Sequence, residues 1–133
     1  MDDQPLMEIA KKASLHSYSP YSTFQVGAAL LTKPGEVFTG CNVENVSYGL
    51  TMCAERVAVF TAVSCGKKRG DFVKMAVAGR RYNGDWQPCS PCGACRQVIN
   101  EFCGQTFHII YGGDEGIKSV SIEDLLPDGF SEF

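Results

Sequence analysis

The sequence lacks the features that mark a membrane-spanning, secreted or nucleic-acid-binding protein. It has no uninterrupted apolar run of membrane-spanning length. Its formal net charge of −3 is the wrong sign for binding a phosphate backbone. Residues 1–12 also lack the charge pattern and apolar stretch of a secretion signal. We therefore expect an intracellular, cytoplasmic protein that binds neither membranes nor nucleic acid.

The sequence also gives no indication of a disulfide framework, because the number of cysteines, seven, is odd and no secretion signal precedes them. Thiols in a reducing compartment serve as core residues, metal ligands or catalysts. Three of them, Cys89, Cys92 and Cys95, are crowded into a short segment, which core packing rarely needs. Three others have no cysteine neighbour and are interpreted as packing residues: Cys41, Cys65 and Cys103.

The composition is that of one globular domain, which we assign to residues 1–133. Hydrophobic residues make up 44% and charged residues 20% of the chain, enough for a buried core. Apolar periodicity and turn residues predict helices at 5–18, 51–66 and 92–103, with a short helical turn at 123–130. The same signals predict strands at 24–32, 36–42, 72–80, 107–112 and 117–122.

This order of elements, β-β-α-β-α-β-β after the first helix, predicts an α/β fold. We expect a single mixed five-stranded sheet covered by helices. The turn at 113–116 is too short for a helical crossover, so the final strand should be antiparallel to its predecessor.

The spacing of the thiols leaves two kinds of zinc site open. Cys92 and Cys95 lie three apart at a helix start and face the same way. A redox pair would instead follow the first strand of a βαβ unit. Adding Cys53 and Cys89 completes a closed, structural four-thiol zinc site, whereas three ligands with an open position are the catalytic pattern. Glu55, two residues after Cys53, has no role in the closed site.

Several longer segments carry a resemblance to a known family. They are "YSPYSTFQVGAAL", "TGCNVENVSYGLTMCAERVAVF", "SPCGACRQVI" and "LLPDGF", and they span nearly the whole chain. With "CAE" at one helix start and "PCGAC" at another, the sequence resembles the zinc-dependent cytidine deaminase family in its small three-cysteine form. The resemblance implies one Zn²⁺ per chain, held by Cys53, Cys92 and Cys95, with Glu55 as the catalytic acid and base that is not a ligand.

The resemblance also implies a reaction, namely hydrolytic deamination of cytidine and 2′-deoxycytidine to uridine and 2′-deoxyuridine in pyrimidine salvage. Three thiolates and one Zn²⁺ carry a net negative charge, which opposes ionisation of a bound water. Helix N-termini and Arg56 can return positive charge by interacting with the thiolates. Arg96 and Gln97 could act similarly. The alternative for Arg56 is an ordinary surface residue.

By resemblance, six residues bind the substrate: Phe24, Asn42, Glu44, Tyr48, Ala54 and Phe130. Asn42 and Glu44 would hold the ribose hydroxyls, and Phe24 would stack on the ring. Tyr48 and Phe130 would reach the active site of a neighbouring subunit in a homotetramer. The alternatives are a solvated loop for Asn42 and Glu44, and ordinary packing for the aromatic residues.

Three features favour a free nucleoside as the substrate. The chain is acidic, Glu44 would repel a phosphate near the sugar, and the last two strands form a hairpin. By resemblance, relatives that edit polynucleotides have a crossover helix at that hairpin. The remaining alternatives are a deaminase of a related cytosine nucleoside such as an antibiotic, a nucleic-acid editor, and a zinc-stabilised binding module that uses Cys89 as a fourth ligand.

Overall fold

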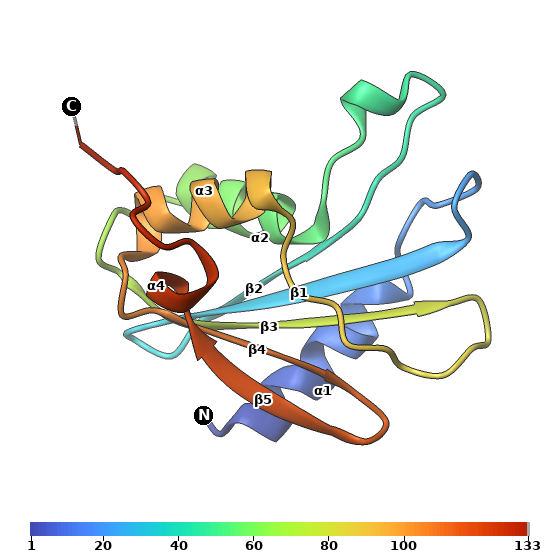
Figure 1. Cartoon of the computed structure of the whole chain (residues 1–133), viewed down its shortest axis with the longest axis horizontal. Helices are drawn as coiled ribbons and strands as arrows, with labels where there is room; N and C mark the ends of the chain where they lie inside the picture. Colours follow the sequence, from blue (N-terminus) through green and yellow to red (C-terminus); the bar gives the residue numbers. More distant parts are fainter. Residues whose placement is uncertain (133) are drawn as a thin grey trace.

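A mixed sheet of five strands, in the order β2-β1-β3-β4-β5, runs through the centre of the computed structural model, which describes residues 1–132 (Figure 1). The strands are β1 Phe24–Thr32, β2 Val37–Cys41, β3 Phe72–Arg81, β4 His108–Gly113 and β5 Gly116–Ser121. The helices are α1 Asp3–Ser14, α2 Ala54–Ser64, α3 Gly93–Cys103 and α4 Ile122–Leu125, with a 3₁₀ turn, η1, at Tyr48–Leu50.

The strand pairing confirms the predicted α/β architecture. β3 and β4 are parallel, and every other neighbouring pair is antiparallel. β4 and β5 are joined directly as a hairpin, so the final strand is antiparallel as expected. Because β1 and β3 lie inside the sheet, their central residues are buried on both faces and read as continuous apolar runs.

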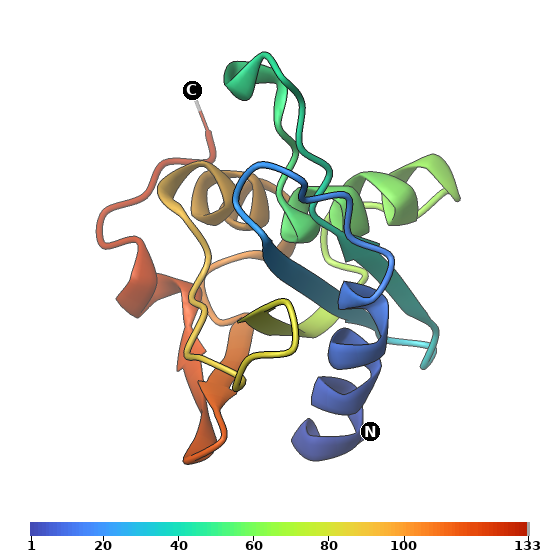
Figure 2. The ribbon, with the colours of Figure 1, turned by 90° about the vertical axis from the view of Figure 1, so that its right-hand side faces the viewer.

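Helices cover both faces of the sheet (Figure 2). On one face, Leu6 and Ala10 of α1 pack against the apolar cluster of β1, β3 and β4. On the other face, Val59 of α2 and Ile99 of α3 pack against the opposite side chains of the same strands. None of the helices within residues 1–132 combines the length and hydrophobicity that crossing a bilayer requires.

Two glycines let the helices approach the sheet closely. A Cβ on Gly27 would stand 2.0 Å from the Ala10 carbonyl oxygen of α1. A Cβ on Gly40 would stand 2.4 Å from the Ala54 carbonyl oxygen, at the first turn of α2. Only a residue without a side chain fits at such distances. Gly40 therefore helps to determine how close the start of α2 lies to the sheet.

Two predicted helix boundaries are wrong because pairing between distant segments overrides local helix propensity. The helix expected at 5–18 ends at Ser14, because Tyr18 pairs with Val43 as a short bridge. The helix expected at 51–66 starts at Ala54, because Met52 pairs with Val43 from the other side. The other predicted elements occur with smaller shifts, apart from the last helical turn, which is confined to Ile122–Leu125.

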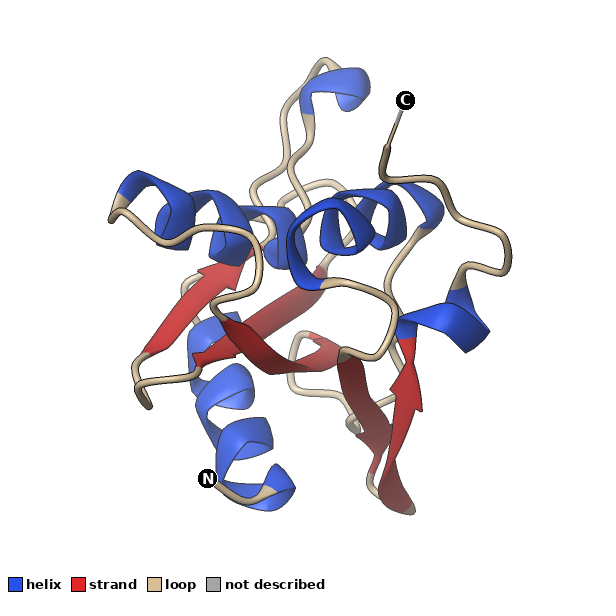
Figure 3. Cartoon of the chain, turned by 90° about the vertical axis from the view of Figure 1, so that its left-hand side faces the viewer, coloured by secondary structure: helices blue, strands red, loops and turns tan. Residues whose placement is uncertain are grey.

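Residues 42–52 form an arm that projects beyond the helical layer (Figure 3). Its base is held by paired backbone hydrogen bonds between Val43 and Met52, both 2.9 Å long. The arm exposes large apolar side chains, with Val46 80%, Tyr48 66% and Leu50 67% exposed. Tyr48 also makes an edge-on contact with the ring of Tyr21, at 5.7 Å between centroids.

Candidate metal and catalytic site

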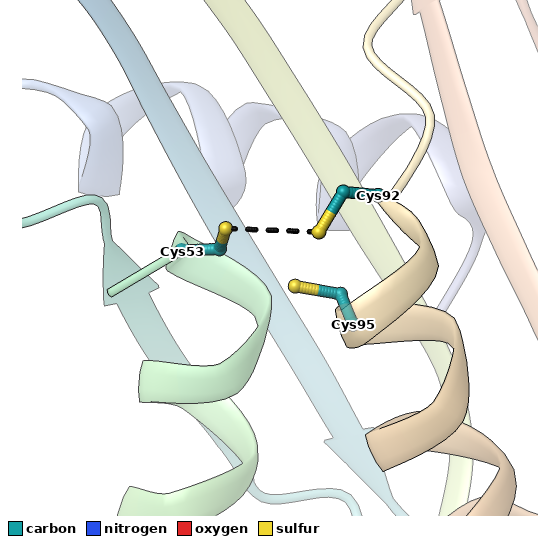
Figure 4. Close-up of side chains that lie close together, drawn as sticks. All are labelled: Cys53, Cys92 and Cys95. Carbon is teal, nitrogen blue, oxygen red and sulfur yellow. Dashed lines mark hydrogen bonds between the residues drawn. The ribbon is translucent and has the colours of Figure 1, made fainter. Parts of the chain in front are cut away.

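The starts of α2 and α3 lie side by side and bring three cysteines together (Figure 4). Cys53 is the N-cap of α2, Cys92 is the N-cap of α3, and Cys95 lies one turn into α3. The sulfurs point toward one another, with 3.9 Å between Cys53 Sγ and Cys92 Sγ. All three sulfurs lie within 4.8 Å of one another. The helix starts that carry "CAE" and "PCGAC" therefore lie next to each other in the structure.

The geometry of these thiols fits a zinc ion. Tetrahedral zinc with Zn–S bonds of about 2.3 Å separates its sulfur ligands by about 3.8 Å, close to the observed spacing. Soft thiolates are also ligands that zinc prefers. Within residues 1–132 this is the one group of three or more potential ligand side chains, and neither Cys89 nor Glu55 belongs to it. The arrangement leaves a fourth coordination position for water or substrate.

The thiol cluster is surrounded by groups that stabilise negative charge. A hydrogen bond from the Cys95 thiol, helped by Arg56, lowers the pKa of Cys53 to about 5 against the opposing effect of burial. The pKa of Cys95 is raised in turn, because its proton is shared with the Cys53 thiolate. Arg56 Nη2 donates to Cys53 Sγ at 3.2 Å, and that contact raises the pKa of the guanidinium. The two helix N-termini add partial positive charge.

Glu55 lies in the first turn of α2, beside the thiol cluster, and is only 4% exposed. Burial raises its pKa to about 7, because a carboxylate removed from water loses its hydration. Its own backbone N–H, Arg56 and the Cys95 thiol lower the pKa, but by less than burial raises it. A carboxyl group with this pKa can both accept and return a proton near neutral pH.

Asn42 and Glu44 follow the end of β2, and both are buried rather than solvated. Asn42 Oδ1 accepts hydrogen bonds from the Val26 N–H at 2.9 Å and from the Ser17 hydroxyl, while Asn42 Nδ2 donates to the Phe24 carbonyl at 2.9 Å. The solvated-loop alternative is therefore wrong for this pair. Both side chains tie the segment before β1 to the base of the arm.

Glu44 Oε1 accepts hydrogen bonds from the backbone N–H groups of Tyr21 and Ser22, at 3.0 and 3.1 Å. Hydrogen bonding from Ser22, through its side chain first and then its backbone, lowers the pKa of Glu44 below its ordinary value. Sequence analysis missed these partners, although "YSPYS" is a recognisable turn segment, because its register against the arm is a tertiary property.

Phe24 and Ala54 lie on the same side of the sheet as the thiol cluster. Phe24 begins β1, and its half-buried ring extends over Gly79 of β3. Ala54 is the first residue of α2, between Cys53 and Glu55, and is fully buried. Cys89 is half-buried, and burial raises its pKa to about 12.

The remaining candidates lie nearer the surface. Tyr48 is on the exposed arm, and Phe130 is 63% exposed in the C-terminal segment. Gln97 Nε2 donates to the Phe130 carbonyl at 2.9 Å, so its amide contacts the C-terminal segment. Arg96 donates to the carbonyl oxygens of Pro91 and Leu125, both at 2.7 Å. Of the cysteines interpreted as packing residues, Cys65 is exposed at the end of α2 and does not pack in the core.

Comparison with known proteins agrees with this geometry. A family model described as "Cytidine and deoxycytidylate deaminase zinc-binding region" matches residues 1–111, which include both helix starts. The fold and the thiol cluster thus define a zinc-binding deaminase.

The relatives with high sequence identity are cytidine deaminases. The chain is 46% identical over 132 residues to a cytidine deaminase of Halalkalibacterium halodurans, covering 98% of this chain and 96% of that protein. It is 44% identical over 133 residues to a cytidine deaminase of Sporosarcina psychrophila, covering 99% and 93%. A crystal structure of cytidine deaminase from Burkholderia pseudomallei superposes with a TM-score of 0.90 at 47% identity, covering 98% and 100%. The chain belongs to the cytidine and deoxycytidylate deaminase family.

Proposed function

We propose that the protein catalyses the hydrolytic deamination of cytidine and 2′-deoxycytidine to uridine and 2′-deoxyuridine, a reaction of pyrimidine salvage. The observation that carries this proposal is a buried carboxyl group, Glu55, beside three thiols that leave a zinc position open. Cys53, Cys92 and Cys95 would hold one Zn²⁺ per chain. The high identity to cytidine deaminases along the whole chain supports the same reaction.

Bound zinc would supply acidity to a coordinated water, whose pKa falls toward neutrality in sites of this kind. Glu55 would accept the proton of the attacking water, deliver it to N3 of the pyrimidine, and later carry a proton to the leaving amine. Burial raises the pKa of Glu55, which favours uptake of the first of these protons. Burial of Glu55 at the start of α2 keeps bulk water from exchanging with the transferred proton.

Arg56 would balance the surplus charge of the three thiolates. Its guanidinium donates to Cys53 Sγ at 3.2 Å, and the two helix N-termini face the same sulfurs. Less electron donation from the thiolates makes the metal a stronger acid, which favours ionisation of the water. A neutral residue at position 56 would leave the negative charge of the cluster uncompensated.

The nucleoside would lie between the thiol cluster and the buried polar pair. Phe24 would stack on the pyrimidine, Ala54 would line the pocket, and Asn42 and Glu44 would bind the ribose hydroxyls. A carboxylate can accept about four hydrogen bonds, so the two backbone donors to Glu44 do not exhaust it. The negative charge of Glu44 disfavours a phosphate at the sugar and supports a nucleoside over a nucleotide.

We also propose a homotetramer in which subunits share active sites, with Tyr48 and Phe130 lent to neighbours. The exposed apolar side chains of the arm support this arrangement, because monomers rarely leave such residues uncovered together. Phe60 and Val63 of α2 are also exposed apolar residues, at 44% and 36%. Residues 1–133 would act as one domain in each subunit.

A cytoplasmic location is part of the same proposal. All seven cysteines are free thiols, which persist in a reducing compartment. A metal site made of three thiolates also requires that its ligands stay reduced.

The central test is the loss of cytidine absorbance with purified, zinc-loaded protein, measured with and without a chelator. We expect turnover of cytidine and 2′-deoxycytidine that the chelator abolishes and added zinc restores. Turnover of another cytosine nucleoside in place of cytidine would support the alternative deaminase. Stoichiometric zinc without turnover of any nucleoside would support the binding module.

The shared site has a separate test. Sedimentation should show a tetramer, and activity per chain should fall on dilution below the assembly constant. Mixing Phe130→Ala chains with inactive Glu55→Gln chains should restore some activity, because mixed sites combine an intact Phe130 with an intact Glu55. A fully active monomer at assay concentration would overturn the shared site without affecting the zinc chemistry.

A further inference from the structure

The loop between β3 and α3 folds back onto the strand that it leaves. The Gln87 N–H donates to the Gly79 carbonyl at 2.9 Å, which pins the loop beside the end of β3. Asn83, with a φ of 57°, makes the reversal possible two residues after the strand ends. The loop therefore delivers Cys89 next to Gly79, on the side of the sheet that α2 and α3 cover.

Gly79 leaves a space that two side chains fill from different directions. A Cβ at this position would stand 2.7 Å from Phe24 Cε1 and 3.0 Å from Cys89 Sγ. These two distances place the sulfur no more than 5.7 Å from this ring carbon, within the reach of a sulfur–aromatic contact. Such sulfur–aromatic contacts are attractive and depend on ring position. Any side chain at Gly79 would push the ring or the sulfur out of place.

The thiol of Cys89 also lies near the catalytic groups without joining the metal ligands. It packs against the core cluster under α2 and α3 and stays outside the group of Cys53, Cys92 and Cys95. Burial first, and then the charges of Glu55 and Cys53, raise its pKa to about 12, so it is a neutral thiol near pH 7. Cys89 is therefore near both the Phe24 ring and Glu55.

We propose that Cys89 is a positioning residue for the Phe24 ring: its sulfur, packed into the space over Gly79, holds the ring at a defined place on the side of the sheet that carries Glu55 and the thiol cluster. The inference rests on the proposed function, because it takes the ring as the surface on which the pyrimidine stacks. Displacing the ring weakens substrate binding, whereas the proton transfers by Glu55 and the metal ligands are unchanged. Cys89 thus acts through Phe24 and needs no contact with the substrate.

The test uses zinc-loaded, assembled protein with three variants: Cys89→Ala, Cys89→Val and Gly79→Ala. Cys89→Ala should raise KM by about 2- to 12-fold, the range that a sulfur–aromatic contact spans, and leave kcat and the zinc content nearly unchanged. Cys89→Val restores the missing volume without the sulfur, so its KM should lie between those of Cys89→Ala and the wild type. Gly79→Ala should raise KM by moving the ring directly. An unchanged KM in both Cys89→Ala and Gly79→Ala would overturn the proposal, and so would loss of zinc from Cys89→Ala.

A double-mutant cycle separates positioning from general packing. In a Phe24→Leu background, Cys89→Ala should add little to the increase in KM, because the ring that Cys89 positions is gone. Equal effects in both backgrounds would overturn the inference. The same cycle measured by thermal unfolding, at fixed protein and zinc concentrations, tests the contact without turnover. Zero coupling between the two substitutions in thermal unfolding would overturn the inference, whatever the substrate is. If only the proposed function is wrong, the wild type will not turn over cytidine, but the coupling in thermal unfolding will remain.

Discussion

Glu44 at the base of the arm and Glu55 at the start of α2 are both buried carboxyl groups, yet their surroundings drive their pKa values in opposite directions. Both side chains are little exposed, at 8% and 4%, but Glu55 lies deeper in the protein and loses more of its hydration. Hydrogen bonding from Ser22 and the Tyr21 N–H lowers the pKa of Glu44. Glu55 has weaker compensation, and burial raises its pKa to about 7.

The difference suits the two carboxyl groups to the two roles that we propose for them. A carboxylate held by donors stays ionised and suits a structural link and the binding of hydroxyl groups. A carboxyl group that burial brings near neutrality can exchange protons, which general acid–base catalysis needs. Depth and donors together decide the outcome. The N–H groups of a turn point at Glu44, whereas burial of Glu55 outweighs the contributions of its own backbone N–H, Arg56 and the Cys95 thiol.

Replacing Glu55 should have the largest effect. Glu55→Gln keeps the size of the side chain but cannot carry a proton, so kcat should fall by about 10²- to 10⁴-fold while the zinc content stays at that of the wild type. The loss of cytidine absorbance measures kcat, and metal analysis of the same sample measures the zinc content. A variant with near-normal kcat would show that Glu55 is not the proton carrier and would remove the contrast with Glu44.

Arg56→Ala should have the next largest effect, because it removes the charge that compensates the thiolates. We expect kcat/KM to fall by about 10- to 100-fold, and the rise of activity with pH to shift to higher pH. The sign follows because losing a positive charge disfavours deprotonation in the site. Arg56→Lys retains the charge, so its pH–rate profile should lie between those of the wild type and Arg56→Ala. If Arg56→Ala has the same profile as the wild type, the charge argument is wrong.

Glu44→Gln should affect stability in a pH-dependent way. The pKa of Glu44 is lower in the folded protein than in the unfolded chain, so its ionised form stabilises the fold at pH 7. That stabilisation is present above the unfolded pKa and is lost as pH falls through the lower, folded pKa. The Tm of the variant should therefore be a few degrees below that of the wild type at pH 7, and the difference in Tm should shrink at acid pH. A constant gap across pH would contradict the assignment.

The smallest effect is expected for metal binding by Cys89→Ser. Cys89 lies outside the ligand cluster, so the variant should still bind one zinc per chain. Metal analysis after extensive dialysis measures this, with Cys92→Ser as the matched control that should lose zinc. Loss of zinc from Cys89→Ser would support the closed four-thiol site and would leave no open position for Glu55 to serve.

Much of the fold follows from local patterns, and the errors occur where distant segments pair. Alternating and continuous apolar runs predicted all five strands and the antiparallel hairpin of β4 and β5. Both misplaced helix ends involve Val43, which pairs with Tyr18 and with Met52. Helix periodicity is a local signal, and it carries no information on backbone pairing with Val43, which lies 25 positions from Tyr18 and 9 from Met52.

Residue types and spacing placed three thiols and a carboxyl group at two helix starts and left two kinds of zinc site open. The resemblance of longer segments to the cytidine deaminase family favoured the catalytic kind. Only the tertiary structure decided that Cys89 stays outside the cluster, that Asn42 and Glu44 are buried, and that Glu44 and Glu55 differ in pKa. The reason is physical. Ligand sets and pKa values depend on distances of a few ångströms and on which donors face a group, and those donors come from segments far apart along the chain.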